Sequence, residues 1–203
     1  MSDWTLYKRQ PGFVLGFHGC DEAVGEAVLA GKQHLKASNN SHDWLGAGIY
    51  FWESSPHRAM QWATESIQRK KQTKGAIRKP FVVGAIIDLG QCCSLFDAAA
   101  LDELKFAYDV LETLHAKQGV PMPQNKGTPP DKVLRYLDRA VIEMMHEVRK
   151  LQGLPAYDCV RAAFGEGGEL YPGAGLSARN HIQIAVRNPD CIKGYFRPIR
   201  APS

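Results

Sequence analysis

The stretch DWLGAGIYFW, residues 43–52, decides how this chain is expected to fold. Its two glycines break any helix, and the β-forming residues at its end then run together. This order predicts a tight turn that leads into a short buried strand. Directly after the strand, Ser54 or Ser55 is expected to cap a helix with Pro56 at its first position, where the missing proline N–H removes no hydrogen bond.

Further strands are expected on both sides of this stretch. Residues 13–17 (FVLGF) predict a strand that ends in the tripeptide HGC at 18–20, and Asp21 is placed to cap a helix that stops at Gly31. Residues 81–89 (FVVGAIIDL) are too uniformly apolar for one face of a strand to be exposed to solvent, so they predict a buried strand.

The C-terminal half combines long helices with strands. Helical patterns cover about residues 97–118 and 130–152, and the second pattern places apolar residues on one stripe. The members of that stripe are Val133, Leu134, Leu137, Val141, Met144, Met145 and Val148. Strand patterns follow at residues 157–164, 181–187 and 191–196. We therefore expect an α+β fold in a single domain, residues 1–203, in which about 97–152 form a helical insertion or buttress.

Composition and charge limit the classes to which the protein belongs. Of its 203 residues, 44% are hydrophobic and 23% are charged, which fits a globular protein with a real core and excludes a disordered tail or a rod. No apolar run reaches the roughly 18 residues of a membrane span, and the first residues lack the order of a secretory signal, so we expect a cytoplasmic protein without a membrane partner. A net charge of +4 and a basic run over residues 69–79 permit an anionic ligand or a nucleic acid.

The cysteines favour reduced thiols. There are five of them, an odd number, and no two form a CxxC pair, which argues against a disulfide framework. His18 and Cys20 would be half of a zinc site, but no second pair of ligands stands at the spacing that structural zinc requires. We therefore expect no metal.

Three short motifs carry residues suited to chemistry: HG at 18–19, GIYF at 48–51 and HIQI at 181–184. Their order and spacing resemble those of ADP-ribosyltransferases of the diphtheria-toxin and poly(ADP-ribose) polymerase class, in which a Ser/Pro-rich helix start follows the second motif. The resemblance is close over residues 13–66 and loose over residues 157–196. It implies an ADP-ribosyltransferase-like split β-sheet core with flanking helices, and NAD as the substrate.

The resemblance also implies how NAD would be held. His18 would bond a ribose hydroxyl, and the backbone of Gly19 would pair with the nicotinamide carboxamide, a close approach that tolerates no Cβ. Tyr50 would stack on the nicotinamide ring, with Trp62 or alternatively Trp52 as a second aromatic face, since a flat cationic ring is attracted to electron-rich faces.

Two positions depart from the family pattern. Arg58 stands where the polymerases carry a serine, and would meet a phosphate or face solvent. Where many members carry glutamate, this chain offers His181 and Gln183, two residues apart and on one face of a strand. Glutamine can orient a hydroxyl but cannot take a proton, which favours single transfer over chain elongation. A general base would come from His181, from Glu166 or Glu169 in the preceding glycine-rich loop, or from the target itself.

The sequence therefore leads to the hypothesis of an NAD-dependent mono-ADP-ribosyltransferase, a glycosyltransferase that modifies a cytosolic protein or nucleic acid. A bacterial toxin or defence effector with an inhibitory antitoxin partner fits this hypothesis. Three alternatives stay open: an NAD glycohydrolase that uses water, a catalytically silent module that binds NAD or ADP-ribose, and a non-enzymatic interaction protein whose helices over residues 97–152 supply the binding surface.

Overall fold

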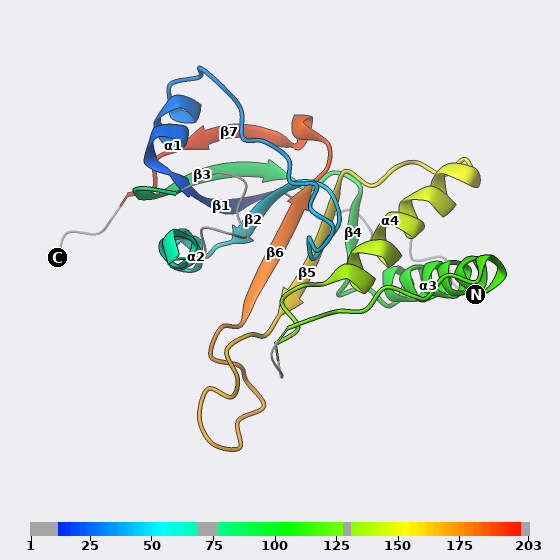
Figure 1. Ribbon diagram of the computed structural model, residues 1–203. Coiled ribbons are helices and arrows are strands. Elements are labelled where there is room, and N and C mark those ends of the chain that lie inside the picture. Colours follow the sequence, from blue (N-terminus) through cyan, green and yellow to red (C-terminus); the bar gives the residue numbers. More distant parts are fainter. Residues whose placement is uncertain (1–11, 69–76, 128–130, 200–203) are drawn as a thin grey trace.

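One seven-stranded sheet, with four α-helices in the described ranges, makes the chain an α+β protein, as expected (Figure 1). The structure is a computed structural model that describes residues 12–68, 77–127 and 131–199. The strands are β1 (Phe13–Asp21), β2 (Ile49–Glu53), β3 (Pro80–Asp88), β4 (Cys92–Ser94), β5 (Cys159–Phe164), β6 (His181–Val186) and β7 (Ile192–Phe196). The helices are α1 (Glu22–Leu29), α2 (Pro56–Gln68), α3 (Ala98–Gln118) and α4 (Tyr136–Leu151).

The sheet, in the order β4-β5-β6-β2-β1-β3-β7, has two parts that meet between β1 and β2. Every residue of β1 pairs with β3, whereas the pairing of β1 with β2 is limited to Gly16 with Glu53 and Phe17 with Trp52. In Figure 1, β1, β3 and β7 run across the molecule, while β6, β5 and β4 turn downward from them. The short ladder between β1 and β2 is therefore the joint between two differently directed parts of the sheet.

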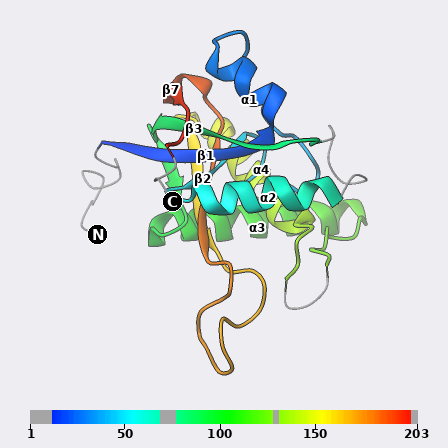
Figure 2. The same cartoon turned by 90° about the vertical axis from the view of Figure 1, so that its left-hand side faces the viewer.

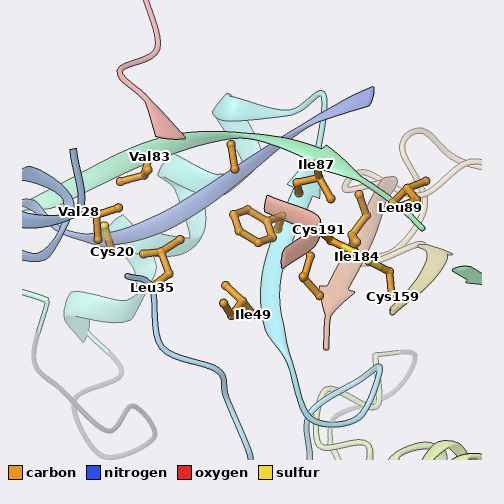
Figure 3. Packing of buried hydrophobic residues seen from close by; sticks show 13 residues of the cluster. Cys20, Val28, Leu35, Ile49, Val83, Ile87, Leu89, Cys159, Ile184 and Cys191 are labelled. Atoms are coloured by element: carbon orange, nitrogen blue, oxygen red, sulfur yellow. The ribbon is translucent and has the colours of Figure 1, made fainter. Parts of the chain in front are cut away.

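Both faces of the sheet are covered. On one face, Val83 and Ile184 belong to an apolar cluster that α1 closes with Val28 (Figure 3). On the other face, α2 packs on β1 and β2, while α3 and α4 pack against each other and against β5. Because side chains alternate along a strand, β2 contributes Phe51 to the first face and Tyr50 to the second.

Most helix boundaries follow their sequence signals. Asp21 and Asp97 cap α1 and α3, each accepting a hydrogen bond from the backbone N–H two residues further on. Helix α2 begins at Pro56, as expected. At the other end of α3, Gly119 has a φ of 64°, the left-handed conformation that commonly ends a helix.

The start of the last helix was predicted wrongly. Helix α4 begins at Tyr136 and not near residue 130, so Val133 and Leu134 of the expected apolar stripe lie outside it. Leu134 instead exchanges two backbone hydrogen bonds with Lys126, of 2.8 and 2.9 Å. This pairing holds the segment before α4 in an extended form, which the apolar spacing alone does not reveal.

Strand β1 runs to Asp21, one residue past the HGC tripeptide in which it was expected to end, so that motif closes the strand as predicted. Two other strands differ from expectation. Strand β4 was not predicted, because three residues are too few for a pattern; it pairs in parallel with β5. Strand β7 starts at Ile192, after a 3₁₀ turn over Pro189–Cys191.

Other expectations concern the surface and the thiols. None of the helices in the described ranges has the length and apolar character needed to cross a membrane. All five cysteines are free thiols, and Cys159 and Cys191 lie close together in the cluster of Figure 3. Most of the basic run at 69–79 falls outside the described residues.

Candidate functional site

His18 bridges the joint of the sheet. Backbone pairing between β1 and β2 stops at Phe17 and Trp52, and one residue further along β1 the imidazole Nδ1 of His18 lies 2.7 Å from the carbonyl oxygen of Tyr50. A carbonyl can only accept, so Nδ1 carries the proton and donates it. The histidine side chain thus takes the place of a backbone donor where the strands separate.

The second nitrogen of this imidazole remains free. Burial lowers the pKa of His18, and the hydrogen bond to the Tyr50 carbonyl offsets this only in part, so the ring is neutral near pH 7. With its proton on Nδ1, Nε2 presents a lone pair that meets no hydrogen-bond partner among the described residues. Such a nitrogen can accept a hydrogen bond from a ligand hydroxyl.

Tyr50 is engaged through its hydroxyl. The phenol oxygen accepts a hydrogen bond from the Leu45 N–H at 2.8 Å and donates one to the Gly46 carbonyl at 2.7 Å, which fastens the tight turn before β2. Burial raises the pKa of Tyr50, so the phenol stays protonated. Only the ring of Tyr50 is left for contact with a ligand.

The rings of His18 and Tyr50 do not face each other. His18 packs edge-on against Phe51, with ring centroids 5.8 Å apart, on the face covered by α1. Tyr50 packs on the opposite face, with the cluster that includes α3 and α4. The structure brings the two residues together through the Tyr50 backbone, and their side chains lie on opposite sides of the sheet.

Gly19 is required by helix packing. A Cβ at this position would lie 2.3 Å from the carbonyl oxygen of Ala59 and 3.2 Å from the side chain of Ala63, both on α2. The absent side chain therefore lets α2 lie directly on β1, which Figure 2 shows with α2 immediately beneath the strand. This packing explains the glycine without a ligand; its contact with a carboxamide stays a prediction.

A second polar cluster gathers on the α2 face of β6. Arg58 of α2 donates from Nη2 to Oε2 of Glu166 at 2.8 Å, and both side chains are buried. The other carboxylate oxygen of Glu166 lies 3.9 Å from Nε2 of His181, which in turn lies 3.1 Å from Nε2 of Gln183. The four residues come from α2, the loop after β5, and β6.

His181 is fixed in one neutral form. Its Nδ1 lies 2.9 Å from the carbonyl oxygen of Arg179, so Nδ1 carries the proton, and Nε2 then accepts a hydrogen bond from the Gln183 amide. Burial lowers the pKa of His181, against the raising effects of that carbonyl and of Glu166. The side chain is 1% exposed and packs against Trp44 and Phe164. Neither nitrogen is free to take a proton from a ligand.

Unpaired hydrogen-bond donors concentrate beside this cluster. Within the described residues, five buried side-chain nitrogens have no partner, and three of them belong to Trp52 (Nε1) and Arg58 (Nε and Nη1). The Arg58 guanidinium lies 5.9 Å from the Trp52 ring centroid, and Trp62 packs against Trp52 at 5.6 Å. An unpaired buried donor costs about 1–3 kcal/mol, so this group favours a ligand or water that supplies acceptors.

Two pockets are candidates for a ligand site. A pocket of about 530 Å³ between α3, α4 and β5 is mainly apolar, and it shares Trp44 and Phe164 with the surroundings of His181. A polar pocket of about 430 Å³ is lined by Asn39, Ser41, Tyr136, Arg139, Ala140 and Glu143. Neither pocket is lined by His18 or Tyr50, so neither by itself is the predicted NAD site.

Sequence reasoning named most of these residues but not their grouping. It assigned Arg58 to a phosphate or to solvent, whereas the structure pairs it with Glu166, which lies 108 positions further along the chain. It did not single out Trp44 and Phe164 as neighbours of His181; the aromatic residue in DWLG was the only signal. Among the described residues, no group of three His, Cys, Asp or Glu side chains is placed to hold a metal ion.

These observations define an α+β protein with a histidine-bridged joint in its sheet and a buried charged cluster beside it. No family model matches the chain. The chain is 26% identical over 194 residues to an uncharacterized protein of Methanocaldococcus jannaschii, and the aligned region covers 87% of this chain and 83% of the relative. No solved structure matches. The similarity extends over most of both chains and carries no activity with it.

Proposed function

We propose that the protein is an NAD-dependent mono-ADP-ribosyltransferase. The observation that carries the proposal is the His18 imidazole, which spans the joint of the sheet through Nδ1 and keeps Nε2 as a free acceptor. In the ADP-ribosyltransferase-like split core that the sequence resembles, this is the histidine that would bond a ribose hydroxyl of NAD. The three motifs lie on consecutive strands of the sheet, β1, β2 and β6; the His18 ring is on the α1 face, and the side chains of His181 and Gln183 are on the α2 face.

The residues around β6 suit the demands of this reaction. Departure of nicotinamide needs no protein acid, because the ring is cationic when bound and leaves neutral; the protein must orient the ribose and stabilise positive charge next to its anomeric carbon. Gln183 can orient a hydroxyl, and Glu166 supplies a negative charge. The unpaired donors of Trp52 and Arg58 offer hydrogen bonds to the acceptor groups of a dinucleotide.

A macromolecular acceptor is supported by the loop between β5 and β6. This loop projects from the body of the molecule in both views (Figures 1 and 2). Leu170, Tyr171 and Leu176 are exposed on it, an unusual concentration of apolar side chains for a projecting loop. The acceptor we propose is a cytosolic protein or nucleic acid, and the setting is that of a bacterial toxin or defence effector restrained by an inhibitory partner.

The test follows label from adenine-labelled NAD in the presence of the purified chain and, separately, RNA, DNA or cell lysate. Movement of label to a macromolecule is expected. His18→Asn should lower the rate by at least about 100-fold, because asparagine keeps a donor near the position of Nδ1 and removes the acceptor Nε2. His34→Ala, at an exposed histidine, is the matched control and should leave the rate unchanged. A fully active and folded His18→Asn variant overturns the proposal.

Two other activities are separated by the same assay. An NAD glycohydrolase is favoured by the lack of a carboxylate on β6 itself, and it would release free ADP-ribose without labelling a macromolecule. A catalytically silent binding module is favoured because the His181 ring is buried and the Tyr50 hydroxyl is already hydrogen-bonded to the backbone. Such a module would bind NAD without consuming it.

A further inference from the structure

One carboxylate oxygen of Glu166 is held by an ion pair, and the other accepts no hydrogen bond from the described residues. Its Oε2 binds Arg58 at 2.8 Å, and its backbone carbonyl accepts a hydrogen bond from the Arg179 N–H at 2.9 Å, so both ends of the residue are fixed. Oε1 accepts no hydrogen bond from the described residues, and Nε2 of His181 lies 3.9 Å from it. One oxygen of the carboxylate is thus positioned and unpaired.

The neighbouring residues cannot replace this carboxylate as a proton acceptor. Nε2 of His181 is occupied by the Gln183 amide, and Nδ1 of His181 already carries a proton. The Gln183 amide itself does not ionise. Glu65, also on α2, is paired with Arg179, and Glu169 is exposed further out on the loop, where it accepts a hydrogen bond from the Gly173 N–H. Glu166 is therefore the carboxylate that reaches the β6 cluster within the described part of the chain.

We propose that Glu166 is the catalytic carboxylate of this site, contributed by the loop after β5 in place of an acid on β6. This inference rests on the proposed transfer from NAD. Arg58 is then a positioning residue, which holds the Glu166 side chain against the cluster. Gln183 and His181 are joined by a hydrogen bond, and the His181 ring lies beside the Glu166 carboxylate.

The bond between the anomeric carbon and the nicotinamide nitrogen breaks, and its electron pair leaves with nicotinamide, which becomes neutral. A lone pair of the acceptor nucleophile forms the new bond to that carbon, and the proton of the acceptor passes to Oε1 of Glu166 and then to water. The negative charge of Glu166 also stabilises the positive charge that develops on the ribose.

The test compares Glu166→Gln with Glu147→Gln, a matched substitution at an exposed residue of α4. Glutamine can still accept a hydrogen bond from Arg58, so the loop remains tied, while the charge and the base are removed. With NAD as the probe, we expect nicotinamide release and label transfer to fall at least about 100-fold in kcat for Glu166→Gln, with the KM for NAD nearly unchanged. Glu147→Gln should behave like the wild type.

The outcomes separate this inference from the proposed function. If the wild-type chain transfers label from NAD and Glu166→Gln does so at the same rate, the assignment of Glu166 is wrong and the transferase proposal stands. If the wild-type chain neither consumes NAD nor transfers label, both are wrong. If Glu166→Gln is inactive and its thermal unfolding is also lowered, Glu166→Asp decides: partial recovery of kcat supports the carboxylate, and restored stability without activity overturns it.

Discussion

Replacing Gly19 with alanine should move α2 away from β1 and disturb both candidate sites together. The added Cβ would lie 2.3 Å from the Ala59 carbonyl oxygen, and ordinary contact begins near 3.4 Å, so α2 must retreat by about 1 Å or the strand must bend. Overpacking of this kind typically costs about 1–3 kcal/mol. For a chain of this size, a loss of about 2 kcal/mol corresponds to a fall of about 4–8 °C in Tm. Arg58, on the same helix, would shift relative to Glu166.

The measurement is thermal unfolding followed by circular dichroism, together with NAD consumption. Gly194→Ala in β7 is the matched control, because a Cβ there meets nothing within 4 Å and the glycine has no positive φ. We expect the control to stay within about 0.5 kcal/mol of the wild type. Equal Tm values for the two variants would refute the packing explanation of Gly19. A stable but inactive Gly19→Ala variant would instead indicate that the space at this glycine belongs to a ligand.

Three further changes have defined outcomes. Tyr50→Phe leaves the backbone groups at 45–46 without their phenol partner and should lower the free energy of unfolding in urea by about 1–3 kcal/mol, whereas Tyr171→Phe, at an exposed tyrosine, should not. Burial and nearby arginines lower the pKa of His146 to about 3. Between about pH 6.5 and pH 3 the imidazole is therefore protonated in the unfolded chain and neutral in the folded chain. The free energy of unfolding falls as the pH is lowered through this window. His146→Gln should reduce the stability loss between pH 7 and pH 5 by at most about 2 kcal/mol; an unchanged pH dependence would contradict the shift. Asp97→Ala should cost about 1 kcal/mol by removing the cap of α3, and no change in urea unfolding would contradict that role.

Local signals predicted the elements of this fold well where they were strong. Asp21, Asp97 and Pro56 mark helix starts through interactions with their immediate neighbours, so the sequence alone locates them. The start of α4 was missed because Leu134 pairs with Lys126 across a loop, and an apolar residue fits an extended bridge as well as a helix. The three residues of β4 carry no period of their own and depend on β5 for their pairing.

The candidate site was predictable in its residue types but not in its pairings. The HG and GIYF motifs mark residues that lie on adjacent strands. The alternation of side chains along β1 and β2 places the rings of His18 and Tyr50 on opposite faces of the sheet. Hydrogen-bond registers and helix placement decide such details, and they depend on contacts between distant parts of the chain. The pairing of Arg58 with Glu166 spans 108 positions and has no local signature.

The placement of the proposed acid on a loop has a structural consequence. An acid on β6 would be fixed by the sheet, whereas Glu166 is fixed by the base of the β5–β6 loop. There the Arg179 N–H donates to the Glu166 carbonyl, and the Ala178 N–H donates to the Gly168 carbonyl. These two hydrogen bonds close the loop at its root, and Arg58 ties the root to α2. These contacts hold the root of the loop, while the exposed tip with Tyr171 lies beyond it. Changes at the tip should accordingly alter which acceptor is used and leave the position of the carboxylate unchanged.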